Sequence, residues 1–566
     1  MLPSSLSKTS LILAAVVACV LSLALQGHTL WTPLLITDDI AQHNVWLDAG
    51  EGSGFLPDDP WVDTSKVIQP YVTAAVFQLF RLVLPTLLVG KVIALLMLAL
   101  TAFLVFRMAA CLGGVRLGWV AMGLLFVSDA WIGMSGGFAR SFAWPLVCGF
   151  VLALLQQRGG LAALCLFLAA ALYPIVFVML APAYAFIFLL GQARDGWRQT
   201  FHVGAQFRAQ WPLLLAVAAG SALVLLKSRE IGLHPHLGPQ VTLAQIQGDP
   251  VYGQGGRVPL WPPVPLHVML PWTLLPWDKT LLEPVVRHAA ALPASLAWVV
   301  RVGLPVGGVL LFTLAIGLVW RRWRDGALVL LALAAAGVVT FGLAELLLPR
   351  LYESSRYLVW SMPVLGVLAL AVVLDAAIGL LRPGRVRQAA LLVLGLVLVS
   401  RAPAIRGKGA EDMSEYAPLY TALVRTGGEE MIATFPRTGD LIPVLCHRSI
   451  FISHEASHAV LFTRYRELVM QRQAAQLKAF YSAQAADVRA FCKDNNISWL
   501  VVEEKYYRPD MPPGVLFAPF EQRLRDLLNQ TPEPWLLAHA RKSGKQVQPG
   551  VYLLNTGPII DSPELP

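Results

Sequence analysis

The chain has 566 residues, of which 56% are hydrophobic and only 14% are charged. A soluble globular domain carries about 25% charged residues, so this composition excludes an ordinary soluble protein and predicts a polytopic membrane protein. The net charge is +9. The basic residues lie in short loops between apolar runs, so we interpret them as determinants of membrane orientation. We expect no nucleic-acid partner.

Apolar runs of span length, or close to it, follow one another through the first 400 residues. The first run, 11–25, follows Lys8 and lacks a clear cleavage site, so we take it as an uncleaved span rather than a signal peptide. The run at 71–84 contains Arg81 and ends before Pro85, which favours a position in the membrane interface. The other runs are 86–106, 117–132, 142–155, 161–172, 174–191, 211–226, 297–320, 327–348, 357–380 and 388–400. The bundle is therefore predicted to have about eleven spans.

Arginines in the loops indicate how these spans are oriented. If the loop after the first span lies outside, the alternate, inside loops contain twelve arginines and only two acids, Asp195 and Asp325. The positive-inside rule predicts this arrangement. The arginines are Arg107, Arg116, Arg158, Arg194, Arg198, Arg208, Arg321, Arg322, Arg324, Arg382, Arg385 and Arg387. The chain after Ser400 then emerges outside, and we expect a bacterial inner membrane with these outer parts in the periplasm.

Two long loops are predicted on the outer face. The loop at 27–70 contains seven carboxylates against one lysine, Lys66. The loop at 227–296 is rich in Pro, Gly and Trp, and its segment 253–263 cannot form a regular helix. Long loops in compact proteins are often lids or binding loops, so Arg257 is a candidate substrate-binding residue.

Hydropathy falls after about residue 407. We therefore predict a membrane domain over 1–406 and an extracytoplasmic domain over 407–566. The predicted strands are 431–435, 450–453 and 499–503, and the predicted helices are 464–481, 486–495 and 520–529. Strands that alternate with helices indicate a small α/β domain, attached to a chain that is mainly α.

The adjacent carboxylates Asp38 and Asp39 are the first candidates for chemistry. Two neighbouring carboxylates at a membrane surface can act as a general base for an incoming hydroxyl. They can also hold a divalent cation such as Mg²⁺ or Mn²⁺ through their oxygens, although no cofactor is certain. The alternative is that they only cap a helix, since Thr37 precedes them.

Gln42 and His43 follow the aspartates at helical spacing. Asp38 to Gln42 and Asp39 to His43 are both i to i+4, so each pair would share one face of a helix that starts here. Both are candidate substrate-binding residues, and His43 could also orient the base. A plain pair on a helix surface is an equal alternative.

Arg140 and Ser141 lie in a Gly-Gly-Phe-Ala-Arg-Ser segment at 136–141, at the start of a predicted span. An arginine placed there is costly without a partner. Arginine and helix N-termini both attract anions, so this segment is a candidate site for a lipid phosphate. The alternative is an arginine that extends to lipid headgroups from the interface.

A third candidate site lies between two spans at 349–357. Arg350, Tyr352, Glu353 and Arg356 occur close together there, and Arg356 is a second candidate for the phosphate, with Tyr352 beside it. The alternative is a Glu353–Arg356 ion pair on the surface, which would contribute little stability.

The segment His454-Glu-Ala-Ser-His458 has the spacing of a zinc-protease helix. However, a predicted strand runs directly into it, and no third ligand is evident downstream. A structural role, or a role as part of a substrate lid, is therefore the better interpretation.

With these residues in hand, the chain resembles the GT-C class of membrane glycosyltransferases. The resemblance is carried by Asp38-Asp39 in the first external loop, by many unequal spans, by a long late external loop and by the C-terminal α/β domain. It implies sugars carried on polyprenyl phosphate or pyrophosphate, and an acidic first-loop residue that acts as base or metal ligand. The domain lacks the WWD-type motif of oligosaccharyltransferases, which argues against N-glycosylation of protein sequons.

The predicted function is therefore glycosyl transfer on the outer face. The expected partners are a polyprenyl-phosphate-linked sugar donor, a glycan, lipid or protein acceptor, and membrane lipids. Two alternatives stay open: a transporter or flippase for a polar lipid, and a non-catalytic envelope assembly protein. A transporter would carry ionisable residues within its spans, and the interiors of these spans are almost free of them.

Overall fold

The computed structural model describes residues 6–50, 52–128, 130–134, 136–195, 203–275, 294–381, 384–407, 409–531 and 533–561. A helix lies at each of the eleven predicted spans, because each run is apolar around its whole circumference. These helices are α1 (Lys8–Gln26), α6 (Thr86–Gly113), α7 (Val115–Val127), α8 (Ala143–Leu155), α9 (Gly159–Leu172), α10 (Pro174–Asp195), α11 (Val203–Leu233), α15 (Ala294–Arg322), α16 (Arg324–Leu346), α18 (Met362–Leu380) and α19 (Arg385–Ile405).

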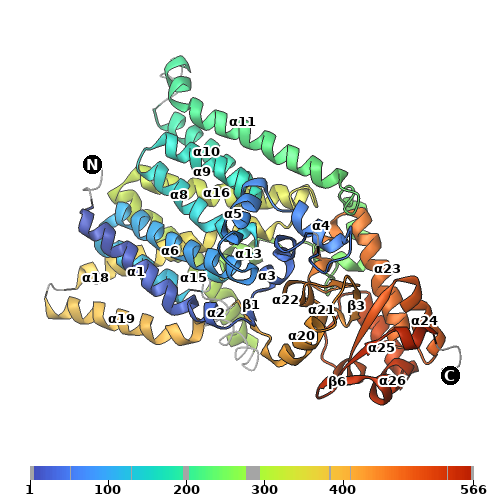
Figure 1. Ribbon diagram of the computed structural model, residues 1–566. Helices are drawn as coiled ribbons and strands as arrows, with labels where there is room; N and C mark the ends of the chain where they lie inside the picture. Colours follow the sequence, from blue (N-terminus) through green and yellow to red (C-terminus); the bar gives the residue numbers. More distant parts are fainter. Residues whose placement is uncertain are drawn as a thin grey trace.

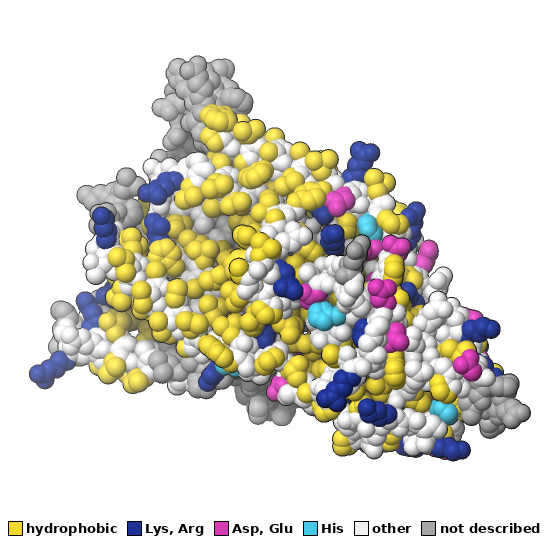
Figure 2. All heavy atoms as spheres, viewed as in Figure 1, with side chains coloured by type: hydrophobic (Ala, Val, Ile, Leu, Met, Phe, Trp, Pro, Cys, Tyr) yellow, Lys and Arg dark blue, Asp and Glu magenta, His cyan; other side chains and the backbone are white. Residues whose placement is uncertain are grey.

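Five stretches of the described helices are long and apolar enough to cross a membrane. They are residues 8–26, 86–113, 211–233, 324–346 and 355–380. The protein is therefore a helical membrane protein, whereas the count of eleven spans stays a prediction. Figure 2 shows hydrophobic side chains over most of the visible face of the bundle.

The run that was expected in the membrane interface forms the short helix α5 (Tyr71–Arg81). The hydrophobic side chains at its end, Leu79, Leu82 and Val83, are exposed. The break predicted near Tyr173 is also present, because α9 ends at Leu172 and α10 begins at Pro174.

The chain between α1 and α5 crosses the junction between the bundle and the C-terminal part (Figure 1). It forms α2 (His28–Trp31), β1 (Leu35–Ile36), α3 (Asp38–His43) and α4 (Pro60–Val67). Lys91 of α6 holds the start of this segment. Its Nζ donates to the carbonyl oxygens of Thr29, Thr32 and Pro33, at 2.8, 2.9 and 3.2 Å. A buried ammonium is thereby satisfied, and the segment that leads into α3 is fixed to the bundle.

The C-terminal part is built on a five-stranded mixed sheet in the order β4-β3-β5-β7-β6. Its strands are β3 (Met431–Thr434), β4 (Ser449–Ile450), β5 (Ile497–Glu503), β6 (Lys545–Gln548) and β7 (Val551–Asn555). β3 pairs in parallel with β4 and β5, and β7 is antiparallel to β5 and β6. Its helices are α20 (Ala417–Val424), α21 (Pro436–Gly439), α22 (Ile442–Cys446), α23 (Thr463–Phe480), α24 (Ala485–Asp494), α25 (Phe520–Gln530), α26 (Trp535–Ser543) and α27 (Gly557–Asp561). All six predicted elements are present, with ends shifted by a few residues.

Two features join the C-terminal part to the rest of the chain. β2 (Glu411–Asp412) pairs antiparallel with β1, so the chain leaving the last helix returns to the segment that precedes α3. The long loop contains α12 (Leu243–Gly248) and α13 (Leu266–Thr273), and its described residues 234–265 pack on the C-terminal domain. Tyr252, fully buried, donates its hydroxyl to the carbonyl of Val460 at 2.6 Å. This part of the loop is therefore docked; residues 276–293 lie outside the described residues.

Candidate active site

A cavity of about 630 Å³ lies where the helical bundle meets the C-terminal domain. Eight of the nine predicted site residues line it. These are Asp38, Asp39, Gln42, His43, Arg140, Arg257, Tyr352 and Arg356. Segments that are far apart in the sequence thus meet in one place, of the size usual for a small-molecule site.

Ser141 is the predicted residue that does not line the cavity. Its side chain is fully buried, and its hydroxyl has no hydrogen-bond partner among the described residues. Arg140 and Ser141 lie in a short 3₁₀ turn, Ala139–Phe142, ahead of α8, and of these two residues it is Arg140 that lines the cavity.

Helix α3 presents the two aspartates at its start. Thr37 is the N-cap, and its hydroxyl accepts a hydrogen bond from the amide of Ile40 at 3.4 Å. Asp38 and Asp39 therefore occupy the first turn, where the helix dipole favours negative charge. Their environments differ: the side chain of Asp38 is 54% exposed and that of Asp39 is 4% exposed. The N-cap is thus Thr37, and not an aspartate as the capping alternative expected, and Asp38 remains accessible.

Arg140 joins the two carboxylates. Its Nε is hydrogen-bonded to Asp39, and its Nη2 lies 3.2 Å from Asp38 Oδ1. Two like charges in adjacent positions would repel each other, and the shared guanidinium offsets this repulsion. The structure therefore engages Arg140 with the carboxylates, rather than leaving its guanidinium open for a phosphate.

The preceding glycines explain how Arg140 reaches α3. Gly137 has φ +82°, and a Cβ on it would lie 2.5 Å from the backbone nitrogen of Ile40. Gly136 has φ +75°, and its Cβ would overlap the carbonyl oxygen of Gly90. Only glycine permits this conformation together with this close approach.

Arg356, which also lines the cavity, forms an ion pair with Glu353. Its Nε donates to a carboxylate oxygen of Glu353 at 2.9 Å, as the alternative interpretation of this segment expected. Tyr352 adopts φ +62°, which is uncommon for a residue other than glycine, and burial raises the pKa of its hydroxyl. Arg140, Arg356 and the carboxylates that pair with them therefore all line one cavity.

Among the lining residues that were not predicted site residues are Lys227, Glu455 and His458. Lys227 lies near the end of α11, and its Nζ lies 3.2 Å from both carboxylate oxygens of Glu230. Glu455 and His458 belong to the His-Glu-Ala-Ser-His segment, which was weighed only as a metal site or a lid. The charged residues Lys227, Arg229 and Glu230 directly after an apolar run were a signal that could have been used.

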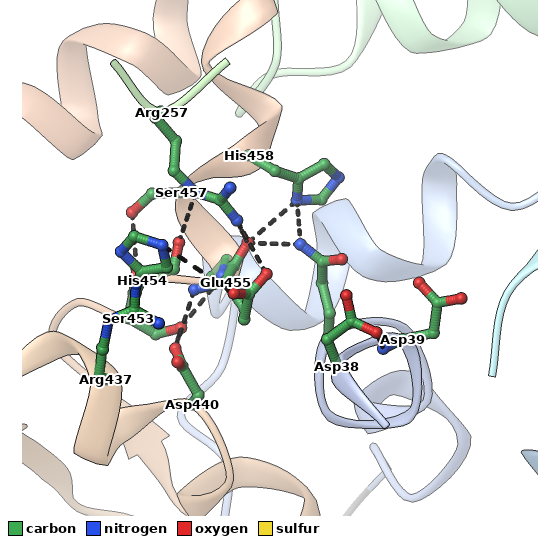
Figure 3. Close-up of polar contacts among 12 residues, drawn as sticks. Asp38, Asp39, Arg257, Arg437, Asp440, Ser453, His454, Glu455, Ser457 and His458 are labelled. Carbon is green, nitrogen blue, oxygen red and sulfur yellow. Dashed lines mark hydrogen bonds and ion pairs between the residues drawn. The ribbon is translucent and has the colours of Figure 1, made fainter. Parts of the chain in front are cut away.

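Arg257 holds the 454–458 segment against the cavity (Figure 3). It donates to the carbonyl of His454 at 2.8 Å and to the carboxylate of Glu455 at 2.9 Å. Gln42 of α3 reaches the same segment, since its amide nitrogen donates to the carbonyl of Glu455 and lies 2.6 Å from His458 Nδ1. The C-terminal domain therefore forms one wall of the site.

The histidines near the cavity are held neutral. Burial lowers the pKa of His43 well below its usual value, and the nearby His458 and Arg140 lower it further. Burial and then Arg257 lower the pKa of His458 to about 3. The His43 ring stacks on Phe138 with centroids 4.0 Å apart. These rings can accept or donate hydrogen bonds at neutral pH, but they carry no charge.

A divalent cation on Asp38 and Asp39 does not fit the observed contacts. Among the residues that the structure describes, no three His, Cys, Asp or Glu side chains are placed to hold a metal ion. The guanidinium of Arg140 already occupies oxygens of both carboxylates. Arg140 thus supplies a positive charge beside both carboxylates.

No family model matches the chain, and no curated protein matches it. Among solved structures the chain is similar to the oligosaccharyltransferase of Archaeoglobus fulgidus in the apo form. The two sequences are 13% identical, the match covers 93% of this chain and 73% of that chain, and the TM-score is 0.49. The archaeal AglB of the same organism, in complex with an inhibitory peptide and a dolichol-phosphate, has 14% identity over 89% of this chain and 71% of that chain, with a TM-score of 0.47.

ArnT from Cupriavidus metallidurans bound to undecaprenyl phosphate is also similar, with 13% identity, 88% of this chain and 94% of that chain covered, and a TM-score of 0.42. An oligosaccharyltransferase and two complexes with polyprenyl phosphates thus stand among the structures that this chain resembles. The sequence resemblance led us to expect proteins of this kind.

Proposed function

We propose that this protein is a membrane glycosyltransferase that moves a sugar from a polyprenyl-phosphate donor to an acceptor hydroxyl. One observation carries the proposal: an accessible carboxylate, Asp38, shares a cavity with cations and with apolar residues of helices next to it. That combination suits a substrate with a sugar, a phosphate and a prenyl chain. Fold likeness alone would not assign a reaction.

In the proposed reaction Asp38 is the general base. It accepts the proton of the acceptor hydroxyl, whose oxygen bonds to C1 of the sugar while the bond from C1 to the phosphate oxygen breaks. The polyprenyl phosphate leaves with the electron pair of that bond, and the configuration at C1 inverts. Arg140 positions Asp38 and offsets its charge, and Asp39 positions Arg140.

The phosphate is proposed to lie near Arg356 and Lys227. Four cations and four carboxylates line the cavity, so with neutral histidines the lining has no net charge (4 − 4 = 0). The phosphate would therefore be held by specific contacts rather than by an excess of positive charge. The four cations are Arg140, Lys227, Arg257 and Arg356, and the four carboxylates are Asp38, Asp39, Glu353 and Glu455.

The prenyl chain is proposed to lie along α10 and α11. Ile175, Val224 and Ile231 from these helices form part of the cavity wall. Residues 211–233 are one of the stretches that can cross a membrane, so a lipid tail could pass from the cavity to the bilayer beside it. We further propose that the cavity faces the extracytoplasmic side of a bacterial inner membrane, as the loop arginines predict.

The test is transfer from undecaprenyl-phosphate pentoses and hexoses, labelled in the sugar, to the lipids and glycans of a membrane extract. Asp38→Asn should lower transfer about 10²- to 10⁴-fold, the contribution typical of a general base, and leave binding of undecaprenyl phosphate unchanged. The matched control is Asp58→Asn, an exposed acid of the same loop that does not line the cavity. Full transfer by Asp38→Asn, or lipid movement across vesicles with no transfer by the unaltered protein, would contradict the proposal.

A further inference from the structure

The imidazole of His458 has two nitrogens in different surroundings. Nδ1 lies 2.6 Å from the amide nitrogen of Gln42 and 3.2 Å from the carbonyl of Glu455. Nε2 has no partner among the residues that the structure describes, and the ring lines the cavity. Figure 3 shows this second nitrogen of His458 on the side of the ring away from the dashed contacts.

Gln42 determines which nitrogen of His458 carries the proton. The same amide nitrogen donates to the carbonyl of Glu455, so this end of the side chain must be the NH₂ group and not the oxygen. An NH₂ group can only donate, so Nδ1 of His458 accepts at 2.6 Å, and the longer approach of Nδ1 to the carbonyl of Glu455, 3.2 Å, is then not a hydrogen bond. A neutral imidazole that accepts at Nδ1 carries its proton on Nε2.

The ring is held in this state by its surroundings. The groups that face it are Arg257, Glu455, His43 and Arg356. The ring stands edge to face against His43, with centroids 5.2 Å apart. Burial and the two arginines disfavour the imidazolium, so His458 stays neutral through the physiological range.

We propose that His458, contributed by the C-terminal domain, is a substrate-binding residue whose Nε2–H donates a hydrogen bond to an oxygen of the lipid-linked donor, and that Gln42 is the positioning residue that fixes this tautomer. The inference rests on the proposed function, because the oxygen belongs to the phosphate or to a hydroxyl of the sugar. It makes the C-terminal domain part of the recognition site rather than a separate module.

A matched pair of variants separates the two nitrogens. In His458→Asn the amide oxygen lies at the position of Nδ1, so the contact with Gln42 is kept and the donor is lost. In His458→Gln the amide nitrogen lies at the position of Nε2, so the donor is kept and the contact with Gln42 is lost. We expect His458→Asn to lower kcat/KM roughly 5- to 30-fold, the effect of one lost hydrogen bond, and His458→Gln to retain most activity.

Gln42→Leu tests the tautomer with His458 intact. Without the amide, Nδ1–H can donate to the carbonyl of Glu455, and Nε2 becomes an acceptor. This variant should therefore reproduce the loss seen in His458→Asn. Because the ring is neutral, the ratio of wild-type to His458→Asn activity should be constant from pH 6 to pH 8; a ratio that changes tenfold would indicate proton transfer instead and overturn the proposal.

Binding of undecaprenyl phosphate, which lacks the sugar, identifies the oxygen. Weaker binding by His458→Asn places the contact on the phosphate, whereas unchanged binding with a raised KM for the sugar donor places it on the sugar. Wild-type kcat/KM in both His458→Asn and Gln42→Leu would overturn the inference. If Asp38→Asn is inactive in the same assay, wild-type activity of the His458 and Gln42 variants overturns only the role of His458, and the proposed function stands.

Discussion

The guanidinium of Arg140 is bonded to Asp39 at Nε and lies 3.2 Å from Asp38 at Nη2. One cation therefore serves two adjacent carboxylates that start a helix 101 residues away in the chain. Asp39 is buried and Asp38 is accessible, so the shared contact assigns different roles to two neighbouring residues of the same type. Asp39 holds Arg140 from a buried position, and Asp38 is open to the cavity.

Arg140→Lys should lower kcat/KM by about tenfold or more. A lysine is a point charge and cannot present two directed donors to two carboxylates, so Asp38 would lose its fixed orientation. The measurement is sugar transfer together with thermal unfolding in detergent. Arg425→Lys, at an exposed arginine of the C-terminal domain, is the control and should change neither quantity. Wild-type kinetics in Arg140→Lys would show that a bidentate contact is not needed.

Removal of divalent cations should leave transfer unchanged. Arg140 already provides the positive charge beside both carboxylates, and the described residues hold no cluster suited to a metal ion. The measurement is transfer after dialysis against EDTA, with and without added Mg²⁺ or Mn²⁺. A loss of activity that Mn²⁺ restores would mean that Arg140 moves away from the aspartates in the working enzyme.

Much of the bundle could be predicted from the sequence, because hydropathy is a local property that the membrane enforces. The break before Pro174 and the i to i+4 spacing of Asp38 with Gln42 are equally local, and α3 begins where Thr37 can cap it. Eight of the nine predicted site residues reach the cavity for this reason. Each belongs to a loop that joins two predicted spans or to the start of a span.

What could not be predicted depends on contacts between distant residues. Gln42 and His458 are 416 residues apart, so no local pattern links them. The hairpin of β6 and β7 was missed, although the Pro-Gly pair at 549–550 is a turn signal, because β6 carries mostly polar side chains. The Gly-Gly segment at 136–137 was read as part of a phosphate site, whereas its first role is to let the backbone approach α3.

Glu353→Gln should strengthen binding of undecaprenyl phosphate about two- to fivefold. The carboxylate of Glu353 pairs with Arg356 and competes with a phosphate for the same guanidinium. The pair is partly exposed, so its removal changes the free energy by no more than about 1 kcal/mol. The measurement is lipid affinity in detergent, with Arg356→Gln as the opposite case, which should weaken binding. Weaker binding by Glu353→Gln would place the phosphate elsewhere in the cavity.

The free energy of unfolding should decrease in mild acid because His454 is buried in its neutral form. Burial, with Arg257 and Arg437 nearby, lowers the pKa of its imidazole from 6.5 to about 2. The unfolded chain therefore binds a proton below pH 6.5 that the folded protein does not, and stability falls as the pH decreases. The loss is about 1.4 kcal/mol per pH unit between pH 6 and pH 4.

The measurement is thermal unfolding of the wild type and of His454→Gln from pH 7 to pH 4. Burial beside Glu455 raises the pKa of Asp440 to about 7, which opposes this trend, but it does so in both proteins and so cancels in the difference. The advantage of the wild type should shrink as the pH falls. A difference that is constant with pH would show that His454 is protonated in the folded state.

Gly137→Ala should reduce both stability and transfer. A Cβ at this position would lie 2.5 Å from the nitrogen of Ile40 and 2.7 Å from the carbonyl carbon of Asp39, in a backbone conformation with φ +82°. The overlap is with backbone, so α3 must move, at a cost of about 1–3 kcal/mol. Gly427→Ala is the matched control, because its φ is +71° and nothing lies within 4 Å of the added carbon. It shares the backbone strain without the overlap, so it should lower the unfolding temperature slightly and leave transfer intact. If both variants lose transfer equally, the close approach of Gly137 to α3 does not set the position of the aspartates.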